Sequence, residues 1–139
     1  DGSGRDGTEI DIMESAYFGK GINHALHWDG YGDDHKQVSS GELYNHGIYD
    51  GEFHTFTCIW DEEYIRTYID IEKYPSVEPY FEMKIEDFGN GEFRKDNFIL
   101  LNLAVGGNFP GIWDIDQITA LSDGSARMEV DYVRVFQKK

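Results

Sequence analysis

The chain has few of the residues that mark several classes of protein. It contains one cysteine, Cys58, so no disulfide can form within it. Cys58 lies in the apolar run FHTFTCIW, where a free cysteine normally packs as a small hydrophobic side chain. No stretch approaches about 18 uninterrupted apolar residues, the length that a membrane-spanning helix needs. The sequence therefore indicates neither a disulfide scaffold nor a transmembrane protein.

Basic residues are scarce as well. The chain has 12 lysines and arginines against 27 aspartates and glutamates, which gives a formal net charge of −15 at pH 7. This charge repels polyanions, so we expect neither nucleic acid nor an anionic membrane surface as a partner. A heavily sulfated polysaccharide is disfavoured for the same reason. A neutral ligand fits the charge better.

Helical periodicity is weak, whereas turn residues are frequent. Sixteen glycines separate short runs of aromatic and β-branched residues, a pattern typical of all-β sandwiches and barrels. We expect strands over 8–18, 22–28, 35–40, 53–60, 63–70, 79–85, 97–105 and 127–136. Residues 61–63 form the turn of a hairpin, and 115–124 hold one or two helical turns. Because no linker or repeat divides the chain, residues 1–139 are expected to form one domain.

The stretch EIDIMES holds three carboxylates within the first predicted strand. Side chains alternate between the two faces of a strand, so Glu9 and Asp11 share one face and Glu14 points to the apolar side. Burying an unpaired carboxylate there is costly. A β-bulge at residues 12–13 shifts the register by one residue and returns Glu14 to the face of the other two acids. We therefore predict a bulge and a cluster of three carboxylates.

Such a cluster has three interpretations. A retaining glycosidase uses two carboxyls about 5–5.5 Å apart, one ionised as nucleophile and one protonated as general acid. A third carboxyl between them helps to set which one stays protonated. A solvated acidic face is the simplest alternative on a protein of this charge, and a metal site that includes the nearby His24 and His27 is the third. From the residues alone these alternatives stay open.

Four blocks of the sequence resemble glycoside hydrolase family 16. EIDIMES matches the E-x-D-x-x-E signature of the bulged, laminarinase-like branch of that family. FHTFTCIWDEEYIRTYID is similar to the hairpin after the catalytic strands, FILLNLAVGGNFPG to an inner strand and its loop, and MEVDYVRVF to the closing strand. The blocks occur in the order of the family and extend over nearly the whole chain. The resemblance implies a β-jelly-roll sandwich of two curved antiparallel sheets, with a glycan cleft on the concave face.

The resemblance also implies roles for individual residues. Glu9 would be the nucleophile, Glu14 the acid/base and Asp11 the assisting carboxylate. His27 corresponds to a histidine that faces the active site of the family from the neighbouring strand. His24, three positions away, would point to the other face. The chemistry requires no cofactor.

Further residues are candidates for binding substrate, each with a structural alternative. Sugar rings stack on aromatic rings, and Trp28 and Trp113 adjoin glycine-rich loops, so each either contacts a sugar or caps the core. Asn102, a lone amide in an apolar run, either orients a catalytic carboxyl or satisfies a buried backbone group. Asn108 is expected at the cleft rim. Asp131 matches an aspartate that ligates a structural calcium ion in many family members.

The function that the resemblance implies is endo-acting, retaining hydrolysis of a polysaccharide in a secreted or cell-surface protein. The charge favours a neutral substrate, and β-1,3-glucan is the first choice. An endo-β-galactosidase acting on host, mucin-type or other galactan glycans and a non-catalytic, lectin-like glycan-binding domain are the alternatives. Family members are typically longer, and their first strands precede the catalytic strand. We therefore expect a preceding segment or another chain to complete the sandwich, and the chain alone to be poorly stable or inactive.

Overall fold

The computed structural model describes residues 7–16, 21–41 and 47–139. These belong to two compact units, Asp1–Phe98 and Ile99–Lys139. Residues 17 and 18, at the end of the first predicted strand, lie outside the described residues. In the described part of the chain, no helix is long and apolar enough to cross a membrane. The single domain expected from the sequence stays a prediction.

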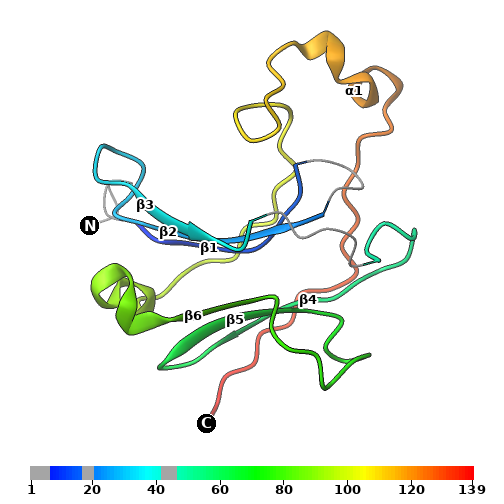
Figure 1. Ribbon diagram of the computed structural model, residues 1–139. Coiled ribbons are helices and arrows are strands. Elements are labelled where there is room, and N and C mark those ends of the chain that lie inside the picture. Colours follow the sequence, from blue (N-terminus) through cyan, green and yellow to red (C-terminus); the bar gives the residue numbers. More distant parts are fainter. Residues whose placement is uncertain (1–6, 17–20, 42–46) are drawn as a thin grey trace. The chain divides into compact units, whose positions relative to one another are not determined.

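Strands of the first unit form two antiparallel sheets (Figure 1). One sheet has the order β1 (Glu9–Glu14), β2 (Asn23–Trp28) and β3 (Lys36–Ser39). The other has the order β4 (Phe56–Trp60), β5 (Tyr64–Ile69) and β6 (Phe81–Lys84). Each of these six strands lies within a predicted strand. Their antiparallel neighbours follow closely in the sequence, so short connections are enough to pair them. The turn between β4 and β5 is at residues 61–63, as predicted, where the Asp61 carboxylate accepts hydrogen bonds from two backbone N–H groups.

The core of this unit contains apolar side chains from both sheets. Buried residues alternate along β5, where Ile65, Thr67 and Ile69 are covered. After β6, the 3₁₀ helices η1 (Ile85–Asp87) and η2 (Gly89–Arg94) add further apolar side chains. The buried apolar cluster comprises Leu26, Trp28, Ile65, Phe81, Met83, Ile85 and Phe93. Two sheets that share a core in this way make a β-sandwich, which confirms the predicted all-β class and is consistent with a jelly roll.

Cys58 packs against the same core. Burial raises the pKa of its thiol to about 11, so the group stays protonated at neutral pH. A protonated thiol is a poor nucleophile. The structural role expected from the sequence therefore agrees with its environment.

The second unit contains short helical elements where the sequence predicts one or two turns. They are η3 (Ile115–Gln117) and α1 (Thr119–Asp123). The predicted strands 97–105 and 127–136 are not formed within the described residues, so this part of the prediction is wrong. Their apolar side chains are exposed, for example Leu100 at 71% and Phe136 at 86%. A strand exists only where its backbone groups pair with a neighbour, and local β propensity does not supply that neighbour.

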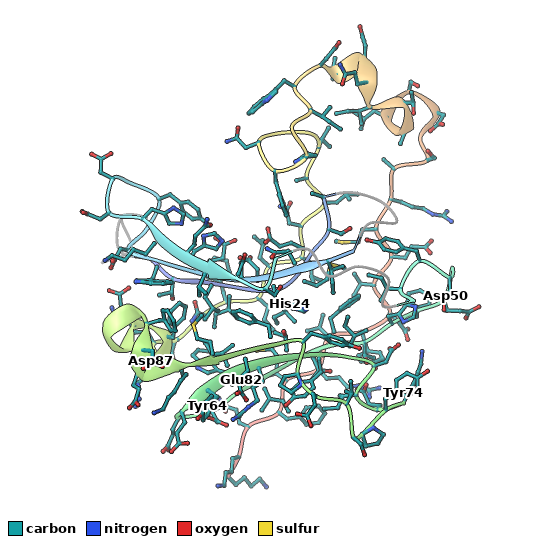
Figure 2. The ribbon with its side chains drawn as sticks, in the orientation of Figure 1. His24, Asp50, Tyr64, Tyr74, Glu82 and Asp87 are labelled. Carbon is teal, nitrogen blue, oxygen red and sulfur yellow. The ribbon has the colours of Figure 1, made fainter. Side chains whose placement is uncertain are left out.

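A polar cluster joins the chain before β4 to the chain after β5. Asp70, 6% exposed, accepts a 2.9 Å hydrogen bond from the Thr55 N–H, and its other oxygen lies 2.7 Å from His54 Nδ1. His54 Nε2 lies 3.0 Å from Asp50, which is labelled in Figure 2. Burial raises the pKa of Asp70, but its hydrogen bonds with Thr55 and His54 outweigh burial and leave that pKa below the ordinary value. Hydrogen bonds to Asp50 and Asp70 raise the pKa of His54.

This cluster predicts a pH-dependent contribution to stability. His54→Ala removes a donor to a buried carboxylate and should lower the free energy of unfolding by about 1.5–3 kcal/mol. Because the pKa of His54 is higher in the folded state, its stabilisation is complete below the ordinary value of 6.5 and is lost as pH rises through the raised pKa. Urea unfolding should therefore show a larger deficit at about pH 5.5 than at about pH 9. A deficit that is equal at both pH values would contradict the pairing, and Lys84→Ala, at an exposed ion pair, serves as the control.

Candidate active site

The predicted bulge is present in β1. The cross-strand pairs are Glu9–His27, Ile10–Leu26, Asp11–Ala25 and Glu14–Asn23, with a register shift between Asp11 and Glu14. The partners at positions 27, 25 and 23 alternate by two and therefore lie on one face of β2. Directly paired residues also share a face. Glu9, Asp11 and Glu14 thus lie together on one face of the sheet, which confirms the bulge hypothesis.

The carboxyl of Asp11 has a strongly raised pKa. Burial, then the negative charges of Glu14 and Glu9, and a hydrogen bond with Glu9 raise the pKa of Asp11 from 3.8 to about 8. At neutral pH this carboxyl is therefore mostly protonated. Charges perturb a pKa in this way only at close range, so the three carboxyls form one electrostatic cluster.

The two outer acids accept hydrogen bonds from different side chains. Asn23, directly opposite Glu14 on β2, donates from Nδ2 to Glu14 Oε2 at 2.9 Å. The hydroxyl of Tyr31, in the loop after β2, donates to Glu9 Oε2. Sequence reasoning missed both donors. The pairing of Asn23 follows once the bulged register is known, whereas no sequence signal indicates the position of Tyr31.

His27 faces the acids from β2, as the resemblance implies. Its Nε2 lies 3.3 Å from Asp11 Oδ2, and its Nδ1 lies 2.8 Å from Nε2 of His35. Burial lowers the pKa of His27 against the opposing charge of Glu9. The imidazole is therefore neutral at pH 7. It has one N–H to share between two neighbours.

The neighbouring residues of β2 face the core. His24, which is labelled in Figure 2, is fully buried. It stacks on Phe81 of the other sheet, with ring centroids 6.4 Å apart and planes 8° from parallel. Trp28 is 8% exposed and packs edge-on against Phe88 and Phe93. The expectation that Trp28 contacts a sugar is therefore corrected. The register of β2 places the indole on the core face, so the capping alternative applies.

A metal interpretation receives no support from this geometry. Across the described ranges, no group of three or more His, Cys, Asp or Glu side chains is arranged to hold a metal ion. His24 and His27 point to opposite faces of β2, so the two histidines cannot both join the acids in one site. Asp131 is exposed and belongs to no such group either. Calcium at Asp131 stays a prediction.

The remaining candidates, Asn102, Asn108 and Trp113, belong to the second unit and have exposed side chains. Asn108 lies in a loop closed by a bridge between Gly107 and Ile112. The Gly107 N–H donates to the Ile112 carbonyl at 2.7 Å, and the reverse bond is 3.2 Å long. Trp113, 74% exposed, follows this loop directly. Their roles in substrate binding stay predictions.

Most of the chain is similar in sequence to known proteins. The family model described as Glycosyl hydrolases family 16 matches residues 2–99. A glucan endo-1,3-beta-glucosidase from Cryptopygus antarcticus is 35% identical over 133 residues, which cover 91% of this chain and 48% of that protein. Glucan endo-1,3-beta-glucosidase A1 from Niallia circulans is 27% identical over 135 residues, which cover 94% of this chain and 19% of that protein. The Clotting factor G alpha subunit of Tachypleus tridentatus is 30% identical over 135 residues, which cover 93% of this chain and 17% of that protein.

No solved structure gives a significant match. The chain spans about half the length of the Cryptopygus protein and less than a fifth of each of the other two relatives.

The proton on Asp11 predicts an unusual pH dependence of stability. Because the pKa of Asp11 rises from 3.8 to about 8 on folding, the folded state holds the proton over this window and the unfolded state does not. The free energy of unfolding should therefore fall as pH rises through the window. Asp11→Asn cannot ionise and should be more stable than the wild type at about pH 8, by roughly 1–3 kcal/mol.

Urea unfolding of the full protein at about pH 5 and about pH 8 measures this difference. The control is Glu62→Gln, an exposed acid in the β4–β5 turn, which should not show the same trend. If the stability of Asp11→Asn relative to the wild type does not increase between about pH 5 and about pH 8, the Asp11 carboxyl is not protonated in the folded state.

Proposed function

The chain belongs to glycosyl hydrolases family 16, and from this premise we propose that it hydrolyses internal linkages of a β-1,3-glucan with retention of anomeric configuration. The observation that carries the proposal is the bulged strand, which aligns Glu9, Asp11 and Glu14 on one face. Asp11 is held protonated between the two glutamates. A solvated acidic face has no need of a shared proton.

The proposed reaction is a double displacement. In the first step Glu9 attacks the anomeric carbon, the glycosidic C–O bond breaks, and Glu14 gives its proton to the leaving oxygen. In the second step Glu14 takes a proton from water, the water oxygen bonds to the anomeric carbon, and the bond to Glu9 breaks. Retention needs the two carboxyls about 5–5.5 Å apart. A single bulged strand is a rigid way to maintain such a spacing.

The neighbours of the acids fit these roles. A protonated Asp11 hydrogen-bonded to Glu9 stabilises an ionised nucleophile. Asn23 orients the carboxyl of Glu14 through its 2.9 Å hydrogen bond. Neutral His27 beside Asp11 adds no charge to compete for the nucleophile. Preorganised donors of this kind are the usual means by which a site stabilises charge during the reaction.

The choice of glucan rests on the relatives and on charge. Two relatives are named as glucan endo-1,3-beta-glucosidases. The net charge of −15 disfavours sulfated galactans. Because polysaccharides do not cross membranes, we propose a secreted or cell-surface location. An endo-β-galactosidase has no observation of its own in its favour beyond the family.

A glycan-binding domain without catalysis is the second candidate function. One relative is named as a clotting factor subunit rather than as a glucosidase. A pure binder, however, gains nothing from three acids that share protons at a cost in stability. The enzyme is therefore the stronger proposal.

Loss of the nucleophile tests the function directly. Glu9→Gln in the full protein should reduce hydrolysis of a laminarin-type β-1,3-glucan by at least about 10³-fold, measured by release of reducing ends. Glu62→Gln should leave the rate unchanged. Undiminished hydrolysis by Glu9→Gln would exclude the assigned nucleophile. A wild type that binds the glucan without cleaving it, in a panel that includes a neutral galactan, would favour the binding function.

The stereochemistry of the product tests the mechanism separately. Proton NMR of the first product formed should show the β anomer, which later mutarotates. Glu14→Gln should lose activity on the polysaccharide but keep a fast first step on an aryl glycoside, seen as a burst of phenolate, because a phenolate leaves without protonation while the second step still lacks its base. An initial α anomer would show inversion and contradict the proposed role of Glu9.

A further inference from the structure

The loop between β2 and β3, residues 29–35, brings two side chains to the acid face. Tyr31 donates its hydroxyl proton to Glu9 Oε2, and His35 Nε2 lies 2.8 Å from Nδ1 of His27. The signature motif of the family includes neither residue. Both lie in the stretch WDGYGDDH, which is rich in glycine and aspartate.

The loop has a defined conformation. Asp29 and Gly30 both have left-handed backbone angles, with φ of 60° and 65°. Two consecutive residues of this kind reverse the chain tightly, as in type I′ turns. The Gly30 N–H donates to the Gly7 carbonyl at 3.1 Å, and Lys36 pairs with Asp29 across the loop. These bonds fix the loop to the chain before β1 and to the start of β3.

Ring packing fixes Tyr31 and His35 beside His27. The centroids of His27 and His35 are 5.1 Å apart with planes 6° from parallel. Tyr31 stacks on the same pair, 4.9 Å from His35 and 5.8 Å from His27. The three rings therefore form one cluster next to the acids. A shift of the loop would move Tyr31 and His35 together away from His27, which belongs to β2.

The neighbours of His27 favour a proton on one of its two ring nitrogens. Asp11 hydrogen-bonds to Glu9, while its Oδ2 is buried without a hydrogen-bond partner and lies 3.3 Å from His27 Nε2. Nε2 is the His27 nitrogen near this oxygen, so a proton there makes a favourable electrostatic contact with it without a full hydrogen bond. His27 Nδ1 must then accept from His35, whose Nε2–H is the donor. The reverse tautomer would leave Asp11 Oδ2 facing a lone pair.

We propose that the β2–β3 loop supplies two positioning residues for the hydrolytic reaction: Tyr31 orients Glu9, and His35 fixes His27 as the Nε2–H tautomer that faces Asp11. The proposal rests on the proposed function. His35 then donates to His27, the N–H of His27 lies on the side of Asp11, and Asp11 and Tyr31 donate to Glu9. Glu9 is ionised before attack and again when it leaves the glycosyl intermediate, and these donors stabilise it at both stages.

The tautomer of His27 is measured without any substrate. In ¹⁵N-histidine-labelled full protein, long-range ¹H–¹⁵N correlation should show His27 protonated at Nε2. His35→Phe keeps a ring in the cluster but removes the donor, so His27 should shift toward a mixture of tautomers. His35→Gln restores an N–H donor and should restore the Nε2–H form. An unchanged Nε2–H tautomer in His35→Phe would overturn the role of His35.

Kinetics test Tyr31. Tyr31→Phe removes one oxygen and keeps the ring, and should lower kcat by about 10–100-fold while KM changes by less than about threefold. Tyr74→Phe, at a 63% exposed tyrosine of the first unit, is the matched control and should leave both constants unchanged. A rise in KM with kcat intact would show that Tyr31 only binds substrate, and would overturn its assignment.

The two measurements separate the further inference from the function on which it rests. If the wild type hydrolyses no glycan, the proposed function fails, while the tautomer of His27 in the three proteins still decides the role of His35. If hydrolysis occurs but neither loop variant changes kcat, the proposed function survives and the positioning roles are wrong. Rescue of kcat by His35→Gln, relative to His35→Phe, supports positioning over a merely structural effect.

Discussion

The pairing of β1 with β2 is the constraint on which the candidate site depends. One face of β2 buries Leu26 and Trp28 in the core, so this strand cannot rotate or slip without exposing them. A one-residue slip in a strand exchanges its two faces. The bulge shifts the register of β1 once, between Asp11 and Glu14, and so places Glu14 on the same face as Glu9 and Asp11. Packing of β2 in the core therefore determines which acids lie together on the opposite face.

That arrangement creates an electrostatic problem within an already acidic chain. Three carboxylates on one face repel one another, and burial of Asp11 adds to the penalty. The structure offsets the repulsion by keeping a proton on Asp11 and by directing donors from Asn23 and Tyr31 at the outer acids. We expect Asp11→Asn to be more stable than the wild type at about pH 8, because the asparagine carries no group that must be kept protonated. Sites that are costly in this way are typical of function rather than of folding.

The sequence predicted the acid cluster correctly, because regular alternation placed Glu14 on the apolar face and a bulge is the local change that corrects this. A carboxylate on an apolar face is costly. The sequence did not decide Trp28, because an aromatic residue beside a glycine-rich loop has the same signature whether it meets a sugar or the core. Alternation decides it once His27 is known to face the acids, because Trp28, the next residue of the strand, must then face the core. Segments 97–105 and 127–136 show the other limit, since β propensity is local and strand pairing is not.

Neither strand alternation nor β propensity predicts the positions of the loop residues Tyr31 and His35, and the reason is physical. Alternation relates side chains along a strand, but Tyr31 and His35 reach Glu9 and His27 only through the backbone angles at Asp29 and Gly30. Aspartate tolerates the left-handed region and glycine favours it, so the sequence permits this turn without requiring it. The register of β1 thus determines which acids lie on the site face, and the loop supplies hydrogen-bond donors to that face. Relatives with the same signature but a different loop would share the acids of this site without sharing its hydrogen bonds.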